Sequence, residues 1–392
     1  MRYAPETEPV FTLTAGPVNA YAGVLQALSG PVLYDYDPAF QAFYQNVVEK
    51  ARVAMRLPNK PVILHGEPVL GLEAAAASLI TPDDVVLNLA SGLFGKGFGF
   101  WAKRYSGHFL EIEVPYNESI DPAAVAAMLK AHPEISVVSV CHHETPSATI
   151  NPIDEIGALV AAHGAYLVVD AVSSFGGMKT HPVDCRADIY VTGPGKCLGA
   201  TAGLTLLGVS DRGWAKMRAN PAAPRASMLS ILDWEHAWSR DAPFPFTPSA
   251  AEVNGLNAAL DLYLAEGPED VWARHELTAR AMRAGARAMG LALWASNDAI
   301  ASPTTTAIRT PDGVDEPMLR AAVRERYGVT LSAGRGEMLG KITRIGHMGP
   351  TAQPVYALVA LSALGGALHA LGHRIDVGSG INAALAVIDA AY

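Results

Sequence analysis

The chain has 392 residues, of which half are apolar and 17% are charged, so it is a folded globular protein and not a disordered one. Its net charge of −9 is spread along the chain, and no basic stretch is interleaved with aromatic residues, which argues against nucleic-acid binding. The three cysteines form no CxxC pair, no apolar run is long enough to cross a membrane, and the amino terminus lacks the apolar core of a signal peptide. We therefore expect a cytoplasmic protein of two domains, with neither a membrane nor a nucleic acid as its partner.

The first three quarters of the chain alternate between short apolar runs and helical patterns. An irregular arm over residues 1–30 precedes these runs and ends in a short helical stretch. Helical patterns cover 39–56, 72–80, 121–131 and 152–163, and strands are expected at 61–64, 84–89, 109–114, 135–140, 166–170, 188–192 and 203–208. Short β-branched runs separated by helices are typical of a mostly parallel sheet whose faces are covered. We predict an α/β fold with a seven-stranded sheet in a large domain over 31–290.

The last part of the chain predicts a smaller α+β domain over 291–392. Residues 219–250 are rich in proline and aromatic side chains without a clean period, so we interpret them as a long loop, and one helix is expected over 251–290. Beyond it, strands are expected at 304–309 and 342–346, and helices at 315–327, 353–371 and 380–391. We expect the arm over 1–30 to join this small domain or an interface.

Two of the expected strands end in residues that suit chemistry. The strand over 166–170 ends in Asp170, and the strand over 188–192 runs into a Gly-Pro-Gly turn that presents Lys196. Open α/β sheets place their sites at the carboxyl ends of parallel strands. A lysine in such a turn suits Schiff-base chemistry, because burial lowers its pKa. The alternatives are that Lys196 is a solvated loop lysine and that Asp170 caps the next helix.

Three segments in the same order resemble a known family. Asp170-Ala-Val-Ser-Ser-Phe-Gly, Gly193-Pro-Gly-Lys-Cys-Leu-Gly and Arg344-Ile-Gly-His-Met-Gly are similar to motifs of aminotransferase class V, the fold-type I pyridoxal-phosphate enzymes. The resemblance spans nearly the whole chain. It implies that Asp170 faces the pyridine nitrogen, that Lys196 forms the Schiff base and moves a proton, and that Arg344 binds the substrate carboxylate.

The same resemblance implies further contacts with the vitamin ring. Phe94, in the glycine-rich turn over 91–97, matches a ring-stacking aromatic position, although it could be an ordinary core phenylalanine. Thr145 matches a hydroxyl near the phenolic oxygen of the ring, and Tyr34 is expected to contact the vitamin as well. The roles of His142 and His143 stay open.

Relatives contribute one segment from the neighbouring subunit. Phe246 and Thr247 occupy that segment here. The resemblance therefore implies a homo-oligomer, a tetramer built from dimers, with active sites at the dimer interfaces.

The chain departs from the family where a phosphate should bind. In relatives a turn at a helix amino terminus offers N–H groups to the cofactor phosphate, and this chain has Glu67 and Pro68 there. Glu67 adds a negative charge, and Pro68 removes an N–H donor. Gly195 stands where a phosphate-binding glutamine is common. We expect this turn to suit an uncharged hydroxymethyl group, unless Glu67 only complements the helix dipole and points away.

A second departure adds a positive charge. Arg335 occupies a position that is usually apolar, and with Arg344 it could clamp a small keto acid, although it could instead pair with Glu337 or another acid. These departures resemble the branch of the class that uses free vitamin B6 as a reactant. They imply the conversion of pyridoxamine and pyruvate into pyridoxal and L-alanine, a step of vitamin B6 degradation, with no tightly bound cofactor.

Two other functions stay possible at this point. One is an ordinary alanine–glyoxylate or serine–pyruvate aminotransferase that holds pyridoxal 5′-phosphate through other residues. The other is a lysine-dependent aldolase or an inactive binding protein on the same scaffold. The twelve histidines show no HExxH or comparable spacing, so we expect no metal site.

Overall fold

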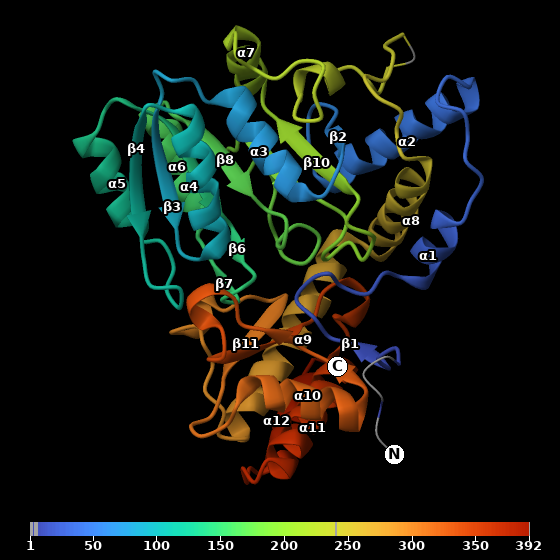
Figure 1. Cartoon of the computed structure of the whole chain (residues 1–392), viewed down its shortest axis with the longest axis vertical. Helices are drawn as coiled ribbons and strands as arrows, with labels where there is room; N and C mark the ends of the chain where they lie inside the picture. Colours follow the sequence, from blue (N-terminus) through green and yellow to red (C-terminus); the bar gives the residue numbers. More distant parts are fainter. Residues whose placement is uncertain (1–2, 4–6, 240, 392) are drawn as a thin grey trace.

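The computed structural model describes residue 3 and residues 7–239 and 241–391. Its centre is a seven-stranded sheet with the order β2-β10-β9-β8-β5-β3-β4 (Figure 1). Its strands are β2 (Val62–His65), β3 (Val85–Ala90), β4 (His108–Glu113), β5 (Ile135–Cys141), β8 (Tyr166–Asp170), β9 (Ile189–Thr192) and β10 (Leu204–Val209). Only β10 runs against its neighbours, and the other pairs from β9 to β4 are parallel. The predicted mostly parallel α/β sheet is confirmed.

Helices cover this sheet because each presents an apolar surface to buried strands. Helices α3 and α4 pack against its strands and lie in front of the sheet in Figure 1. The helices of this part are α1 (Ala22–Leu28), α2 (Pro38–Ala54), α3 (Pro68–Leu79), α4 (Leu93–Tyr105), α5 (Pro122–Ala131), α6 (Ile153–His163), α7 (Asp211–Ala219), α8 (Ala250–Glu266) and α9 (Pro268–Ala288). Short strands β6 (His143–Glu144) and β7 (Thr149–Ile150) form a hairpin directly after β5.

Two sequence expectations were wrong in detail. The single helix over 251–290 is two helices, because Gly267 takes a left-handed φ of 92° and Pro268 then starts α9. The glycine-rich segment 91–97 is not a turn throughout, since α4 begins at Leu93 and Phe94 lies in its first turn. Helix α7, which the sequence analysis did not expect, follows β10.

A smaller unit lies below the carboxyl ends of the parallel strands (Figure 1). It contains an antiparallel sheet with the order β11-β14-β13 and helices α10 (Glu316–Tyr327), α11 (Pro354–Ala370) and α12 (Val377–Asp389). Its strands are β11 (Thr305–Arg309), β12 (Val329–Thr330), β13 (Ser332–Ala333) and β14 (Ile342–Gly346). The arm pairs with it, because β1 (Phe11–Thr12) lies parallel to β12.

The apolar cores follow the same division. One large cluster fills the space around the seven-stranded sheet, and a second joins α9 to α10, α11 and α12 and includes Leu13 of the arm. The clusters do not divide at the proposed boundaries, since Val24 of the arm belongs to the first cluster and Ala281 and Met282 belong to the second. The boundaries at 30 and 290 stay predictions. In the described part of the chain, no helix is long and apolar enough to cross a membrane, and no cluster of His, Cys, Asp and Glu could hold a metal ion.

Candidate active site

A cavity of about 240 Å³ lies between the carboxyl ends of the strands and the smaller unit. Five residues singled out from the sequence line it, namely Glu67, Phe94, Asp170, Lys196 and Arg335. The parallel pairing explains part of this gathering, because Asp170 lies beside Cys141 of β5 and Val191 of β9 in the sheet register. The arm, α3, α4 and the loop after β13 close the remaining sides.

Lys196 presents a half-buried amine to this cavity from the loop after β9. Its Nζ donates a hydrogen bond to the Ala15 carbonyl at 3.1 Å. Burial lowers the pKa of Lys196 from its ordinary value, and the charge of Arg344 lowers it further, whereas Asp170 and Glu67 raise it. A lowered pKa increases the fraction of neutral amine, which is the form that can attack a carbonyl or accept a proton.

Asp170 ends β8 as a buried carboxylate. Its Oδ1 accepts the Val172 N–H at 3.0 Å, and the Cys141 thiol also bonds to it. Burial raises the pKa of Asp170 to about 6, while these hydrogen bonds and the charge of Lys196 lower it. A carboxylate in this position can hold a proton on a pyridine nitrogen, because a cationic ring would favour its ionised form.

Two arginines lie on the side of the smaller unit. Arg344 on β14 is buried, and its guanidinium donates to the carbonyls of Ala333 at 2.8 Å and Thr145 at 3.0 Å. Burial lowers the pKa of Arg344 to about 10, and the like charge of Arg335 acts in the same direction. Arg335 itself is exposed at the cavity, and no ion pair joins it to Glu337 or another acid in the described residues. Arg335 can therefore receive a carboxylate at the cavity, whereas Arg344 is not among the residues that line it, and its contact with a carboxylate stays a prediction.

The hairpin strand β6 supports the site from behind. His143 is buried and lines the cavity, and its Nδ1 donates to the Ser173 carbonyl at 2.9 Å, because a carbonyl only accepts. Burial lowers the pKa of His143 to about 4, so its ring is neutral at pH 7. The Thr145 hydroxyl donates to Ser173 Oγ at 2.5 Å. Ser173, which the sequence analysis missed, lines the cavity and Thr145 does not, and the contact of Thr145 with the vitamin stays a prediction.

The turn after β2 does not suit a phosphate dianion. Glu67 is the N-cap residue of α3 without capping it through its side chain, and it lines the cavity. Its charge acts on both Asp170 and Lys196, so the carboxylate faces the site. Pro68 supplies no N–H at the first helical position. Gly195 has no room for a side chain, since a Cβ there would lie 2.8 Å from Ala202 Cα. The ring-binding residues fit a pyridoxal-type ring, but this turn does not fit its phosphate ester.

Five of the expected contacts do not line the cavity of their own chain. Two of them, Thr145 and Arg344, are buried, and the other three are half-buried or exposed. The side chain of Tyr34 is 69% exposed, and its ring contacts Tyr36 with 5.5 Å between centroids. Phe246 is half-buried against the large core, and Thr247 is exposed. Their roles as ligands of a neighbouring subunit stay predictions.

The arm forms a wall of the site that the sequence analysis did not identify. Gly16 and Pro17 line the cavity, and Ala15 holds Lys196. A Cβ on Gly16 would lie 1.8 Å from Lys196 Nζ. No local pattern in the sequence signals this contact, because it joins residues 180 positions apart.

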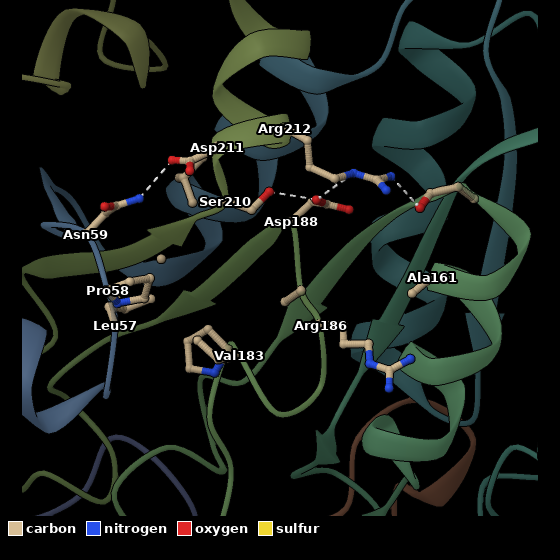
Figure 2. Close-up of a pocket in the computed structure, with 15 residues that line it drawn as sticks. Leu57, Pro58, Asn59, Ala161, Val183, Arg186, Asp188, Ser210, Asp211 and Arg212 are labelled. Atoms are coloured by element: carbon tan, nitrogen blue, oxygen red, sulfur yellow. Dashed lines mark hydrogen bonds and ion pairs between the residues drawn. The ribbon is translucent and has the colours of Figure 1, made fainter.

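A second cavity of about 360 Å³ lies at the opposite edge of the sheet (Figure 2). Three of its charged residues have partners within it: Asp188 accepts from Ser210 and pairs with Arg212, and Asp211 accepts from Asn59. It contains neither Lys196 nor Asp170, so the chemistry lies in the smaller cavity.

Comparison with known proteins decides the family. The model of aminotransferase class V matches residues 102–346, a range that includes Asp170, Lys196 and Arg344. The chain belongs to the aminotransferase class V family. It is 77% identical to the pyridoxamine–pyruvate transaminase of Mesorhizobium japonicum over 390 residues, which are 100% of this chain and 99% of that protein.

Solved structures of the family share the fold. The crystal structure of pyridoxamine–pyruvate aminotransferase from Mesorhizobium loti has a TM-score of 0.99 and 76% identity, with all of both chains covered. Ureidoglycine–glyoxylate aminotransferase from Bacillus subtilis has a TM-score of 0.92 and 28% identity over 98% of this chain and all of its own. The predicted fold-type I architecture is therefore confirmed, and the chain is an aminotransferase by family.

Proposed function

We propose that this protein transfers the amino group of free pyridoxamine to pyruvate, giving pyridoxal and L-alanine in the degradation of vitamin B6. The observation that carries this proposal is a Lys196–Asp170 pair that faces a turn unsuited to phosphate, with Glu67 in the cavity. The similarity to a pyridoxamine–pyruvate transaminase across the whole chain supports it. In this proposal the vitamin is a reactant and no phosphorylated cofactor stays bound.

The cavity residues would each bind one part of pyridoxamine. The protonated ring nitrogen meets Asp170, one face of the ring meets Phe94, and the 5′-hydroxyl donates to Glu67. A phosphate would instead face the Glu67 carboxylate, and two like charges about 4 Å apart repel by about 1 kcal/mol in water and several times more in a protein. The site therefore prefers the vitamin whose 5′-hydroxymethyl group carries no phosphate.

Transfer of the amino group needs a proton to move between two carbons. Arg335 and Arg344 hold the carboxylate of pyruvate, and its carbonyl oxygen leaves as water when the amine condenses with it. Lys196 removes the proton from C4′ and returns it to the α-carbon. The protonated ring accepts the electrons of C4′ during this step, and Asp170 keeps it protonated. The Lys196 amine then adds to C4′ and displaces L-alanine, which leaves the vitamin as an imine of Lys196. Water hydrolyses this imine to pyridoxal and the free lysine amine.

We infer that the protein works in the cytoplasm as a homo-oligomer, a tetramer built from dimers. Tyr34, Phe246 and Thr247 lie outside the cavity of their own chain and would complete the site of a neighbouring subunit. This assignment rests on the family resemblance and on the exposure of Tyr34 and Thr247.

Glu67→Ser tests the proposed subsite. Loss of the carboxylate removes the repulsion and restores a hydroxyl at a helix amino terminus, so we expect kcat/KM for pyridoxamine 5′-phosphate relative to pyridoxamine to rise by about tenfold. Steady-state kinetics with pyruvate measure this ratio. Glu73→Ser, on the same helix but outside the cavity, should leave it unchanged. An unchanged ratio in Glu67→Ser would refute the role of that carboxylate.

Family membership favours one other candidate. The chain is also 28% identical to an alanine–glyoxylate aminotransferase of Drosophila melanogaster. An enzyme of that kind, holding pyridoxal 5′-phosphate, would keep its yellow absorbance through exhaustive dialysis and would use glyoxylate. We expect dialysis to remove the absorbance and pyruvate to be the better acceptor.

A further inference from the structure

Glu144 on β6 is a fully buried carboxylate with no part in the reaction above. Its Oε2 accepts the Phe94 N–H at 3.0 Å, and its Oε1 accepts the Gly95 N–H at 2.6 Å. In the described residues, no lysine, arginine or histidine forms an ion pair with it. Its partners are the second and third residues of α4, whose N–H groups have no acceptor inside the helix.

The helix cannot provide this cap from its own sequence. A Ser, Thr, Asp or Asn at the N-cap position usually accepts these N–H groups, but Gly92 occupies that position in α4. A Cβ on Gly92 would lie 2.4 Å from Glu144 Cδ. The space for a local cap is therefore filled by a carboxylate that comes fifty residues later in the chain.

Two residues in the first turn of α4 contact parts of the site. Phe94 lines the cavity where the vitamin ring is proposed to bind. Leu93 contacts the loop that presents Arg335, since a Cβ on Gly336 would lie 2.8 Å from Leu93 Cδ2. A shift of this turn would move the ring-stacking side chain directly and would loosen the support of Arg335.

We propose that Glu144 is a positioning residue that fixes the first turn of α4, and with it Phe94, against the pyridoxamine ring. This inference rests on the proposed function, because it takes the ring of the vitamin as the partner of Phe94. Both oxygens of the carboxylate must accept for both N–H groups to be held. Glutamine is not equivalent, because its NH₂ group would face an N–H donor.

The ionisation of Glu144 should be visible in the pH dependence. Burial raises its pKa to about 7, and the charge of Asp170 on β8 raises it further, whereas the two N–H groups lower it. The other titratable groups that feel its charge are Cys141 on β5 and Tyr116. As pH falls through 7, one oxygen becomes a hydroxyl, which accepts a hydrogen bond more weakly. The cap then loosens while Asp170, with its pKa of about 6, is still mostly ionised.

A double-mutant cycle tests the link between Glu144 and Phe94. We expect Glu144→Gln to raise KM for pyridoxamine about three- to tenfold, the range of a lost aromatic stacking contact, with a smaller change in kcat. In the Phe94→Ala background the same substitution should change KM less than about twofold, because the contact it positions is already absent. Glu113→Gln removes the ion pair between Glu113 and Lys96 of α4. It is the matched control and should change neither KM nor kcat.

A rescue variant guards against a simple folding defect. Glu144→Ala removes the cap and empties the space beside Gly92, so adding Gly92→Ser lets a hydroxyl at the N-cap position accept the same N–H groups. We expect the double variant to recover at least half of the pyridoxamine affinity lost in Glu144→Ala. Gly92→Ser alone should impair the protein, because its Cβ would collide with the Glu144 carboxylate.

The pH profile of kcat/KM for pyridoxamine completes the test. The ratio of kcat/KM in the unmodified protein to that in Glu144→Gln should fall as pH falls through about 7, because Glu144 then loses its charge, whereas the titration of Lys196 is common to both proteins. Equal losses from Glu144→Gln with and without Phe94, or no recovery with Gly92→Ser, would overturn the inference. Absence of pyridoxamine turnover in the unmodified protein would instead contradict the proposed function.

Discussion

At the scale of single residues, the site depends on a lysine whose pKa is lowered by burial and on a buried carboxylate. Burial lowers the pKa of Lys196 and raises that of Asp170 to about 6. Both shifts reflect the cost of a charge away from water. A cationic ring bound against Asp170 would remove part of that cost, so the reactant itself completes the electrostatics of the cavity.

Lys196→Ala should lower kcat by at least about 1000-fold, within the range for loss of a general acid–base group. Lys179→Ala is the control, because Lys179 is exposed and lies outside the cavity. The pH dependence has a defined sign: the protonated amine cannot accept a proton, so kcat should rise with pH until the amine is neutral. Because the pKa of Lys196 is lowered, that rise should end below the ordinary lysine value. A variant that retains substantial turnover would exclude Lys196 from this role.

At the scale of elements, a strand-end loop and the arm meet at the reactive amine. The arm reaches the site because β1 pairs with β12 of the smaller unit, which directs Ala15 and Gly16 towards Lys196. Gly16 adopts a φ of 123° that other residues rarely take. The arm therefore holds one side of the Lys196 amine, and this contact leaves no room for a side chain at position 16.

Gly16→Ala should lower kcat/KM by about 100-fold, the cost of displacing a reacting group by about 1 Å. The new Cβ would lie 1.8 Å from Lys196 Nζ, so the amine or the arm must move. Gly23→Ala in α1 is the matched control, because its Cβ would meet nothing within 4 Å. Steady-state kinetics of both variants, with their melting temperatures, separate displacement of the amine from loss of folding. Equal kinetics for the two would show that the arm does not constrain Lys196.

Local patterns in the sequence predicted the sheet but not the contacts between distant segments. Most of the seven strands have a short apolar run, β8 ends at Asp170, and the loop after β9 carries Lys196, so both the sheet and these two residues could be predicted. The break at Gly267 was missed because the helical pattern continues on both sides of it. Glu144 and Gly16 were missed because each acts on a residue at least 49 positions away.

At the scale of the whole molecule, one segment exposes several large apolar side chains to solvent. Val32, Tyr34 and Tyr36 are 83%, 69% and 54% exposed on the segment between α1 and α2. This segment lies at the right-hand edge of the view in Figure 1. Clustered exposed apolar side chains often mark an interface. We therefore interpret the segment as a contact between copies of the chain.

Sedimentation equilibrium should give a mass that is a multiple of the chain mass, with a tetramer as the expected species. Tyr34→Ser with Tyr36→Ser should weaken this assembly and raise KM for pyridoxamine together, because the same segment is proposed to serve a neighbouring site. Leu339→Ser, at an exposed apolar position on another part of the surface, is the control and should leave the assembly intact. A monomer that turns over pyridoxamine normally would contradict this interpretation.

The central claim is that the vitamin enters and leaves as a reactant without its phosphate. The most direct measurement compares kcat/KM of exhaustively dialysed protein for pyridoxamine and for pyridoxamine 5′-phosphate, each with pyruvate, while pyridoxal and L-alanine are quantified. We predict strong preference for pyridoxamine and equal amounts of the two products, without any added cofactor. Preference for the phosphate ester, or turnover only after pyridoxal 5′-phosphate is added, would contradict the account.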